Sequence, residues 1–112
     1  MTRTFPLWET VRSTLGRTMQ VYGADVLMTF CESHADLRKS AERWLRAVGT
    51  SVWNAPNDVK AGYAGASILS GDRVVFNLKG NKYRLVAKID YEKQVIRIRR
   101  VGTHAEYSKW KL

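Results

Sequence analysis

The chain has 112 residues, 45% of them hydrophobic, so it can form one domain with a single core and is too apolar to be mainly disordered. Its 19 Lys and Arg against 10 Asp and Glu leave a formal net charge of +9, which favours a polyanionic partner. No apolar run reaches the roughly 20 residues that cross a bilayer, and the first residues lack the apolar core of a secretion signal. We therefore expect a cytoplasmic protein without a membrane partner.

The residues that usually bind metals or cofactors are scarce. Cys31 is the single cysteine, and with only two histidines there is no zinc-binding spacing. Because Cys31 lies in an apolar helical pattern, a buried small side chain is a simpler interpretation than a nucleophile. No carboxylate cluster suits a divalent cation, and no glycine-rich phosphate loop precedes a helix. The sequence predicts neither a metal nor a cofactor.

The beginning of the chain differs from the rest in pattern. Residues 1–18 combine Thr, Arg, Pro and Gly with scattered hydrophobic residues, so we expect a poorly ordered N-terminal extension there. Residues 19–112 are predicted to form the compact domain, with a short strand over residues 19–23 at its start.

Two helices with apolar faces are predicted next, and they should form a hairpin. In the first helix, up to about Glu32, the apolar residues are Val26, Leu27, Phe30 and Cys31. In the second, which should end at Gly49, they are Leu37, Ala41, Trp44, Leu45 and Val48. His34 lies at the junction, where a cap or a local hydrogen bond is a simpler role than catalysis.

A link of about twenty residues should connect these helices to the sheet. Trp53 is expected to fill the core between helix and sheet, with Tyr63 covering the gap beside it. Asn57 or Asp58 could cap one short helical turn that ends at Gly62.

Three alternating runs after Arg73 predict an antiparallel meander. The core side carries Val74, Phe76, Leu78, Tyr83, Leu85, Ala87, Ile89, Ile96 and Ile98. The opposite side carries Asn77, Lys79, Lys82, Arg84, Lys88, Arg97 and Arg99. From Arg73 to Arg100 there are nine basic residues and two acidic ones, so we expect one apolar and one basic face, the latter suited to RNA. A solvated basic face without a ligand is the weaker alternative.

The turns predict how these strands pair. A two-residue turn at Gly80 and Asn81 places Asn77 opposite Arg84. A second turn at Glu92 and Lys93 places Lys88 opposite Arg97, Arg84 opposite Val101 and Lys82 opposite Thr103. The Lys88 and Arg97 pair costs stability unless an anion lies over it.

The same pairing brings His104 beside Lys82 and Arg84, with Glu106 and Tyr107 on a short following helix. Such a set can cut RNA without a metal, by attack of a ribose 2′-hydroxyl on the adjacent phosphate, which needs a base, cationic stabilisation and an acid. Arg84 suits the phosphate because its planar donors bind two oxygen atoms, and the imidazole of His104 could transfer a proton. A phosphate clamp without catalysis is equally compatible with these residues, and Glu106 and Tyr107 could simply stabilise the helix and the edge of the core.

The runs VVFNLKGNKYRLV at residues 74–86 and VGTHAEY at residues 101–107 resemble the HigB-type toxins of bacterial toxin-antitoxin modules, in the RelE/ParE superfamily. The resemblance extends over about residues 19–110. It implies an α+β fold, in which an N-terminal helical hairpin packs on an antiparallel sheet with a short C-terminal helix. It also implies ribosome-dependent cleavage of mRNA. The implied partner is a HigA-like helix-turn-helix antitoxin, and operator DNA would be bound only by the complex of toxin and antitoxin.

Residue by residue, the resemblance places the scissile phosphate at Arg84, with Lys79 and Lys82 as neighbouring cations. The position after the last strand falls on His104, and the C-terminal tyrosine on Tyr107. It does not assign Glu106 or the general base uniquely.

Together these predictions name Arg84, His104, Lys82, Tyr107 and Glu106 as catalytic residues. The predicted RNA contacts are Lys79, Asn77, Lys88, Arg97 and Arg99. Two other functions stay open: a ParE-like toxin that inhibits DNA gyrase by binding, and an RNA-binding module that has lost its activity.

Overall fold

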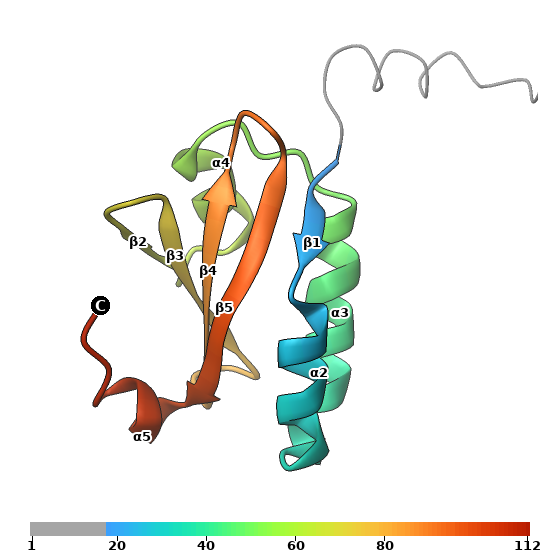
Figure 1. The fold of residues 1–112 in the computed structure, drawn as a ribbon, viewed down its shortest axis with the longest axis vertical. Coiled ribbons are helices and arrows are strands. Elements are labelled where there is room, and N and C mark those ends of the chain that lie inside the picture. Colours follow the sequence, from blue (N-terminus) through green and yellow to red (C-terminus); the bar gives the residue numbers. More distant parts are fainter. Residues whose placement is uncertain (1–17) are drawn as a thin grey trace, which may run out of the picture.

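The computed structural model describes residues 18–112, so the predicted N-terminal extension lies outside the described residues except for Thr18. The elements in chain order are β1 (Gln20–Tyr22), α2 (Ala24–Glu32), η1 (Ala35–Leu37, a 3₁₀ turn), α3 (Arg38–Gly49), α4 (Pro56–Gly62), β2 (Ser67–Leu69), β3 (Arg73–Leu78), β4 (Tyr83–Asp90), β5 (Val95–Thr103) and α5 (His104–Tyr107). The strands form one sheet in the order β1-β5-β4-β3-β2 (Figure 1).

The predicted α+β fold, with a helical hairpin on the sheet and a short C-terminal helix, is confirmed. Helices α2 and α3 lie side by side against β1 and β5, and α5 follows directly on β5 (Figure 1). The predicted first strand is β1, but it pairs with β5 in parallel, whereas all other neighbours in the sheet are antiparallel. The sheet is therefore mostly, not purely, antiparallel.

The hairpin packs the predicted apolar residues against the core except Val26, with Phe30 and Leu45 only partly buried. In α2 the buried residues are Leu27 and Cys31, one turn apart, whereas Val26 is 40% exposed. In α3 the predicted residues Ala41, Trp44 and Val48 are buried, as is Leu37 in η1. A short helix beside a sheet has one contact line, and Val26 lies too far around α2 to reach it.

The chain enters α2 through a glycine that no other residue could replace easily. Gly23 has φ +87°, and a Cβ atom there would lie 2.8 Å from the carbonyl oxygen of Ile98 in β5. Both the left-handed backbone and the close approach require the absence of a side chain. This position fixes how closely the hairpin approaches the sheet.

An aromatic cluster joins the helices to the sheet around Phe76 of β3. The ring of Trp44 meets the Phe76 ring edge-on at 5.2 Å between centroids, and Trp53 stacks on it at 6.0 Å. Tyr63 closes the cluster, also edge-on, at 5.2 Å from Phe76. The predictions that Trp53 fills the core and that Tyr63 covers the gap are thus confirmed.

The link between hairpin and meander holds two features that the sequence did not reveal fully. Helix α4 begins at Pro56, earlier than predicted, because proline suits the first helical turn. The Asp58 carboxylate then accepts a hydrogen bond from the Asn54 backbone N–H at 2.8 Å. Strand β2 was not predicted, because its three residues lie at the sheet edge and are too few to show an alternating pattern.

The first predicted turn gives the correct register with a different geometry. Asn77 lies opposite Arg84, as predicted. The connection is nonetheless the four-residue turn 79–82, whose left-handed residues are Lys79 and Gly80, whereas Asn81 does not have positive φ.

A β-bulge changes the second predicted register. Lys88 lies opposite Arg97, as predicted, but the pairing shifts between Val86 and Ala87. Arg84 therefore faces Gly102 instead of Val101, and Thr103 faces Tyr83 instead of Lys82. One extra residue of β5, Arg99, lies inside the bulge, because Ala87 pairs with Ile98 and Val86 with Arg100.

The outer face of the sheet is only partly the basic surface that alternation predicted. The core-side residues are buried as predicted, but Val75 and Val86 on the other side are 1% and 3% exposed. The C-terminal residues approach this side: a Cβ atom at Gly102 would lie 2.5 Å from the ring of Trp110. The centre of the outer face is therefore apolar at Val75 and Val86, and the exposed cations Lys88, Arg97 and Arg99 form its rim.

Candidate functional site

Arg84, the predicted phosphate-binding residue, is held rigidly at the start of β4. Its side chain is 7% exposed, and its guanidinium donates to the Asn81 carbonyl oxygen at 3.0 Å and to Asn81 Oδ1 at 2.7 Å. The ring of Tyr107 lies 5.4 Å from the guanidinium carbon, within cation–π distance. All these partners are neutral, so they orient the guanidinium without cancelling its charge.

The lack of a neutralising partner matters for what Arg84 can bind. Among the residues that the structure describes, no carboxylate pairs with Arg84, and the ion pair found there joins Lys82 to Asp36. A guanidinium that is fixed but not neutralised is suited to binding an anion, because little side-chain entropy is left to lose. The contact of its guanidinium with the Tyr107 ring also brings Arg84 and Tyr107 together, as predicted.

His104 is the first residue of α5 and is exposed. Its backbone N–H donates to the Lys82 carbonyl oxygen at 3.0 Å, so it lies directly beside the 79–82 turn despite the bulge. Its carbonyl oxygen accepts the hydroxyl of Ser108 at 3.0 Å, which fixes the backbone of α5. The imidazole thus extends to solvent from a well-anchored position.

Glu106 is engaged in capping α5. The Thr103 hydroxyl oxygen accepts the Glu106 backbone N–H at 3.1 Å, and Glu106 Oε1 accepts the Thr103 backbone N–H at 2.8 Å. This reciprocal pair is a capping box, and the Thr103 N–H lowers the pKa of Glu106. Helix stabilisation accounts for these contacts, and a role of Glu106 in proton transfer stays a prediction.

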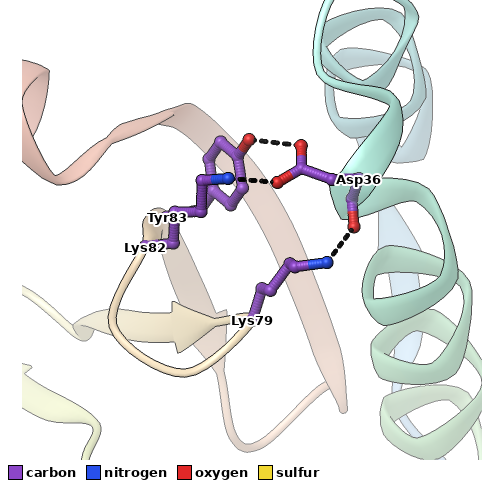
Figure 2. A network of polar contacts seen from close by, with 4 residues as sticks. All are labelled: Asp36, Lys79, Lys82 and Tyr83. Atoms are coloured by element: carbon purple, nitrogen blue, oxygen red, sulfur yellow. Dashed lines mark hydrogen bonds and ion pairs between the residues drawn. The ribbon is translucent and has the colours of Figure 1, made fainter.

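Lys79 and Lys82 are tied to the helical hairpin through Asp36 of η1, as Figure 2 shows. The Asp36 carboxylate accepts Lys82 Nζ at 2.5 Å and the Tyr83 hydroxyl at 2.6 Å, while its backbone carbonyl accepts Lys79 Nζ at 3.0 Å. The hydrogen bonds from Lys82 and then Tyr83 lower the pKa of Asp36 to about 2. Conversely, the bond to Asp36 and burial raise the pKa of Tyr83 to about 12.

The structure therefore places the predicted catalytic residues on two different sides of the sheet. Residues adjacent on a strand point to opposite sides, so Arg84 faces outward while Tyr83 and its bond to Asp36 lie on the helix side. The Lys82 ammonium group is bound there, away from the partners of Arg84.

The other predicted RNA contacts lie elsewhere on the sheet. Lys88, Arg97 and Arg99 are exposed and line a hollow of about 410 Å³ together with Asp72 and Asp90. The Arg97 guanidinium carbon lies 4.9 Å from the ring of Tyr22, which holds that side chain over β1. Asn77 instead donates to the Gly65 carbonyl oxygen at 3.0 Å, a contact that secures the loop before β2. Of this set, the three cations form the rim of the basic face.

Two contributors to the site were missed from sequence. Asn81 was interpreted only as a turn residue, and Asp36 was given no role in the site. The signal for Asn81 is weak, since a turn residue three positions before an arginine is common. Asp36 gives no local signal at all, because its partner Lys82 is 46 residues away.

His34, the second histidine, has the local role that the sequence favoured. Its Nδ1 lies 3.1 Å from the Phe30 carbonyl oxygen, and its ring stacks on Phe30 at 4.0 Å. The ring also meets Tyr83 edge-on at 5.6 Å. These contacts pack the hairpin junction against the start of β4.

Two further findings concern residues 18–112 as a whole. No three His, Cys, Asp or Glu side chains in this range are grouped as ligands of a metal ion. Nor does any helix in this range have the length and apolar character to cross a membrane.

The start of β4, the 79–82 turn and α5 form one corner of the molecule, which holds Arg84 and His104. With the fold, this corner defines a small basic α+β protein that can hold an anion between a strand, a turn and a C-terminal helix. Residues 37–110 match the family model HigB_toxin, described as the RelE-like toxic component of a toxin-antitoxin system. Because the match covers more than half of the chain, the protein belongs to the HigB_toxin family, as its motifs indicated. It is thus the toxic component of such a system, which implies an antitoxin partner. A comparison with curated proteins finds no match.

Proposed function

We propose that this toxin is a ribosome-dependent endoribonuclease that cuts mRNA and so inhibits translation. The observation that carries the proposal is Arg84, a fixed guanidinium with neutral partners only, whose cross-strand partner Gly102 lies two residues before the exposed His104. A corner with an oriented cation and an exposed imidazole that can transfer a proton supports phosphate chemistry more than it supports simple charge attraction.

The reaction that these residues can support is an internal transfer. The ribose 2′-oxygen attacks the adjacent phosphorus, its proton goes to a base, and the bond to the 5′-oxygen breaks as that oxygen receives a proton from an acid. The products are a 2′,3′-cyclic phosphate and a 5′-hydroxyl. No external oxidant or reductant is needed.

Arg84 is proposed to bind two phosphate oxygens and to stabilise the charge that develops on them. His104 is proposed to transfer one of the two protons, with Lys82 as an additional cation and Tyr107 as the support of Arg84. The exposed Lys88, Arg97 and Arg99 would then follow the RNA backbone across the outer face.

The partners follow from this function. The substrate is mRNA on the ribosome, and the antitoxin is proposed to be a HigA-like helix-turn-helix protein. Operator DNA would be bound only through the complex of both proteins. All these partners place the toxin in the cytoplasm.

The test is cleavage of mRNA on programmed ribosomes, with 5′ ends mapped by primer extension. Arg84→Ala and His104→Ala should each lower the rate by about 100-fold or more, because each removes a group that acts in the transition state. Arg97→Ala, which removes a rim arginine of the same sheet, is the matched control and should cost less than about tenfold. Thermal melts establish that the variants fold.

Unchanged cutting by both variants would refute the assignment of the site. A protein that leaves transcripts intact but causes DNA damage on expression would act by gyrase inhibition instead. Ribosome binding without any cleavage would indicate an RNA-binding module.

A further inference from the structure

One cation of the proposed RNA site is already neutralised within the protein. Lys82 Nζ lies 2.5 Å from Asp36 Oδ2, and the Tyr83 hydroxyl lies 2.6 Å from the other carboxylate oxygen (Figure 2). Asp36 immediately precedes the span that matches the family model, which begins at residue 37. The proposed function gives this carboxylate no role.

We propose that Asp36 is a positioning residue that competes internally with RNA phosphate: it holds Lys82 on the helix side of the turn until a phosphate replaces it. The inference rests on the proposed binding of RNA at this corner. A carboxylate and a phosphate both offer anionic oxygens to an ammonium group, so they are alternative partners of Lys82.

The two cations of the corner differ in their freedom to change partner. Lysine is a point charge on a flexible stem with rotatable donors, so Lys82 can exchange one anion for another. Arg84 is fixed by both oxygen atoms of Asn81 and is 7% exposed, so it can only receive a ligand where it is. Phosphate would thus be bound first at Arg84 and then by the released Lys82.

The ion pair between Lys82 and Asp36 is weak enough for Lys82 to exchange Asp36 for another anion. The two side chains are 60% and 34% exposed, and ion pairs at such positions are weak and screened by salt. Tyr83, which is 2% exposed, keeps its hydroxyl on Asp36 when Lys82 leaves. The carboxylate therefore stays in place and can bind Lys82 again. Since the pKa of Asp36 is about 2, the carboxylate is ionised at neutral pH.

The experiment measures binding of a 2′-O-methyl oligouridine, which lacks the 2′-hydroxyl and cannot be cut. Asp36→Asn removes the charge but keeps the backbone carbonyl that Lys79 contacts. We expect binding to become up to about fivefold tighter at low salt, with the gain fading as salt rises. Asp25→Asn, at the other end of α2, makes the same change in net charge and should give a smaller gain.

The double variant Asp36→Asn/Lys82→Ala should lose the gain relative to Lys82→Ala alone. A gain that persists without Lys82, or no gain in Asp36→Asn, would overturn the proposal. Should Asp36→Asn fail to fold, the unmodified protein still decides the matter: the Lys82 ammonium NMR signal should shift on saturation with the oligomer, and an unchanged signal would refute exchange.

The outcomes separate this inference from the proposed function. If the unmodified protein binds the oligomer but does not cut mRNA, the nuclease proposal fails and the role of Asp36 is still decided by the variants. If the protein cuts mRNA while Asp36→Asn binds no tighter, only the role of Asp36 fails. A protein that does not bind the oligomer at all would refute the role of Asp36 alone, because the proposed cleavage takes place on the ribosome.

Discussion

The two turns of the meander are equal in length and have opposite uses. Residues 79–82 join β3 to β4, residues 91–94 join β4 to β5, and each turn has a left-handed residue that is not glycine, Lys79 at φ 49° and Gln94 at φ 56°. In the second turn the Gln94 side chain is buried and bonds the backbone of Trp53 and Tyr91. In the first, the polar side chains lie at the surface.

The comparison of the two turns shows what distinguishes a turn with a structural role from a turn that belongs to a functional site. Gln94 uses its amide group on backbone atoms that cannot move away, so it closes the core at the end of the sheet near α4. Lys82 bonds to the Asp36 carboxylate, which it can leave for another anion, and Asn81 holds the Arg84 guanidinium, which can meet a ligand. The permanence of the bonded partners separates the two cases.

The largest effect should come from Gln94→Leu. The change leaves the buried N–H and C=O of Trp53 without partners, so the free energy of unfolding should fall by about 3 kcal/mol. Urea denaturation measures it, and Gln20→Leu on the exposed edge of β1 is the control, with a change within about 0.5 kcal/mol. Cleavage per folded molecule should not change. A loss below about 1 kcal/mol would contradict the structural role of this turn.

Asn81→Ala should have an intermediate effect, on activity and not on stability. It removes the Oδ1 atom that orients Arg84 at 2.7 Å, but the Asn81 carbonyl contact remains. We expect kcat for mRNA cleavage to fall about tenfold, equivalent to about 1.4 kcal/mol, with KM little changed. Asn57→Ala in α4 serves as the control. A loss of stability comparable to that of Gln94→Leu would remove the contrast between the turns.

The smallest effect should be the pH dependence contributed by Asp36. Its pKa is lowered from 3.8 to about 2 in the folded protein, so its stabilisation is fully present above about pH 4 and is lost as pH falls through about 2. In urea denaturation across this range, Asp36→Asn should flatten the decline of stability with acid, whereas Asp25→Asn should not. An identical slope in Asp36→Asn and the unmodified protein would show that the contact in Figure 2 adds nothing to folding.

Much of the fold could be predicted because it follows local periodicity. The alternation that predicted Val74, Phe76 and Leu78 as core residues, and the helical spacing of Ala41 and Trp44, repeat within a few residues and need no tertiary information. The bulge at Arg99 broke the prediction, since two residues of β5 there oppose one of β4, which no alternation rule contains. The register was therefore correct near each turn and wrong beyond the bulge.

By itself, the sequence determined the α+β class, the hairpin, the core faces of the three long strands and the placement of His104 beside Lys82. Its motifs also indicated the toxin family. Only the tertiary structure decided that Arg84 is held by Asn81, that Glu106 is a cap, and that Lys82 is bound by Asp36. The physical reason is that periodicity assigns a side chain to a face, whereas the partner it meets there depends on segments brought together by folding, such as η1 and the 79–82 turn.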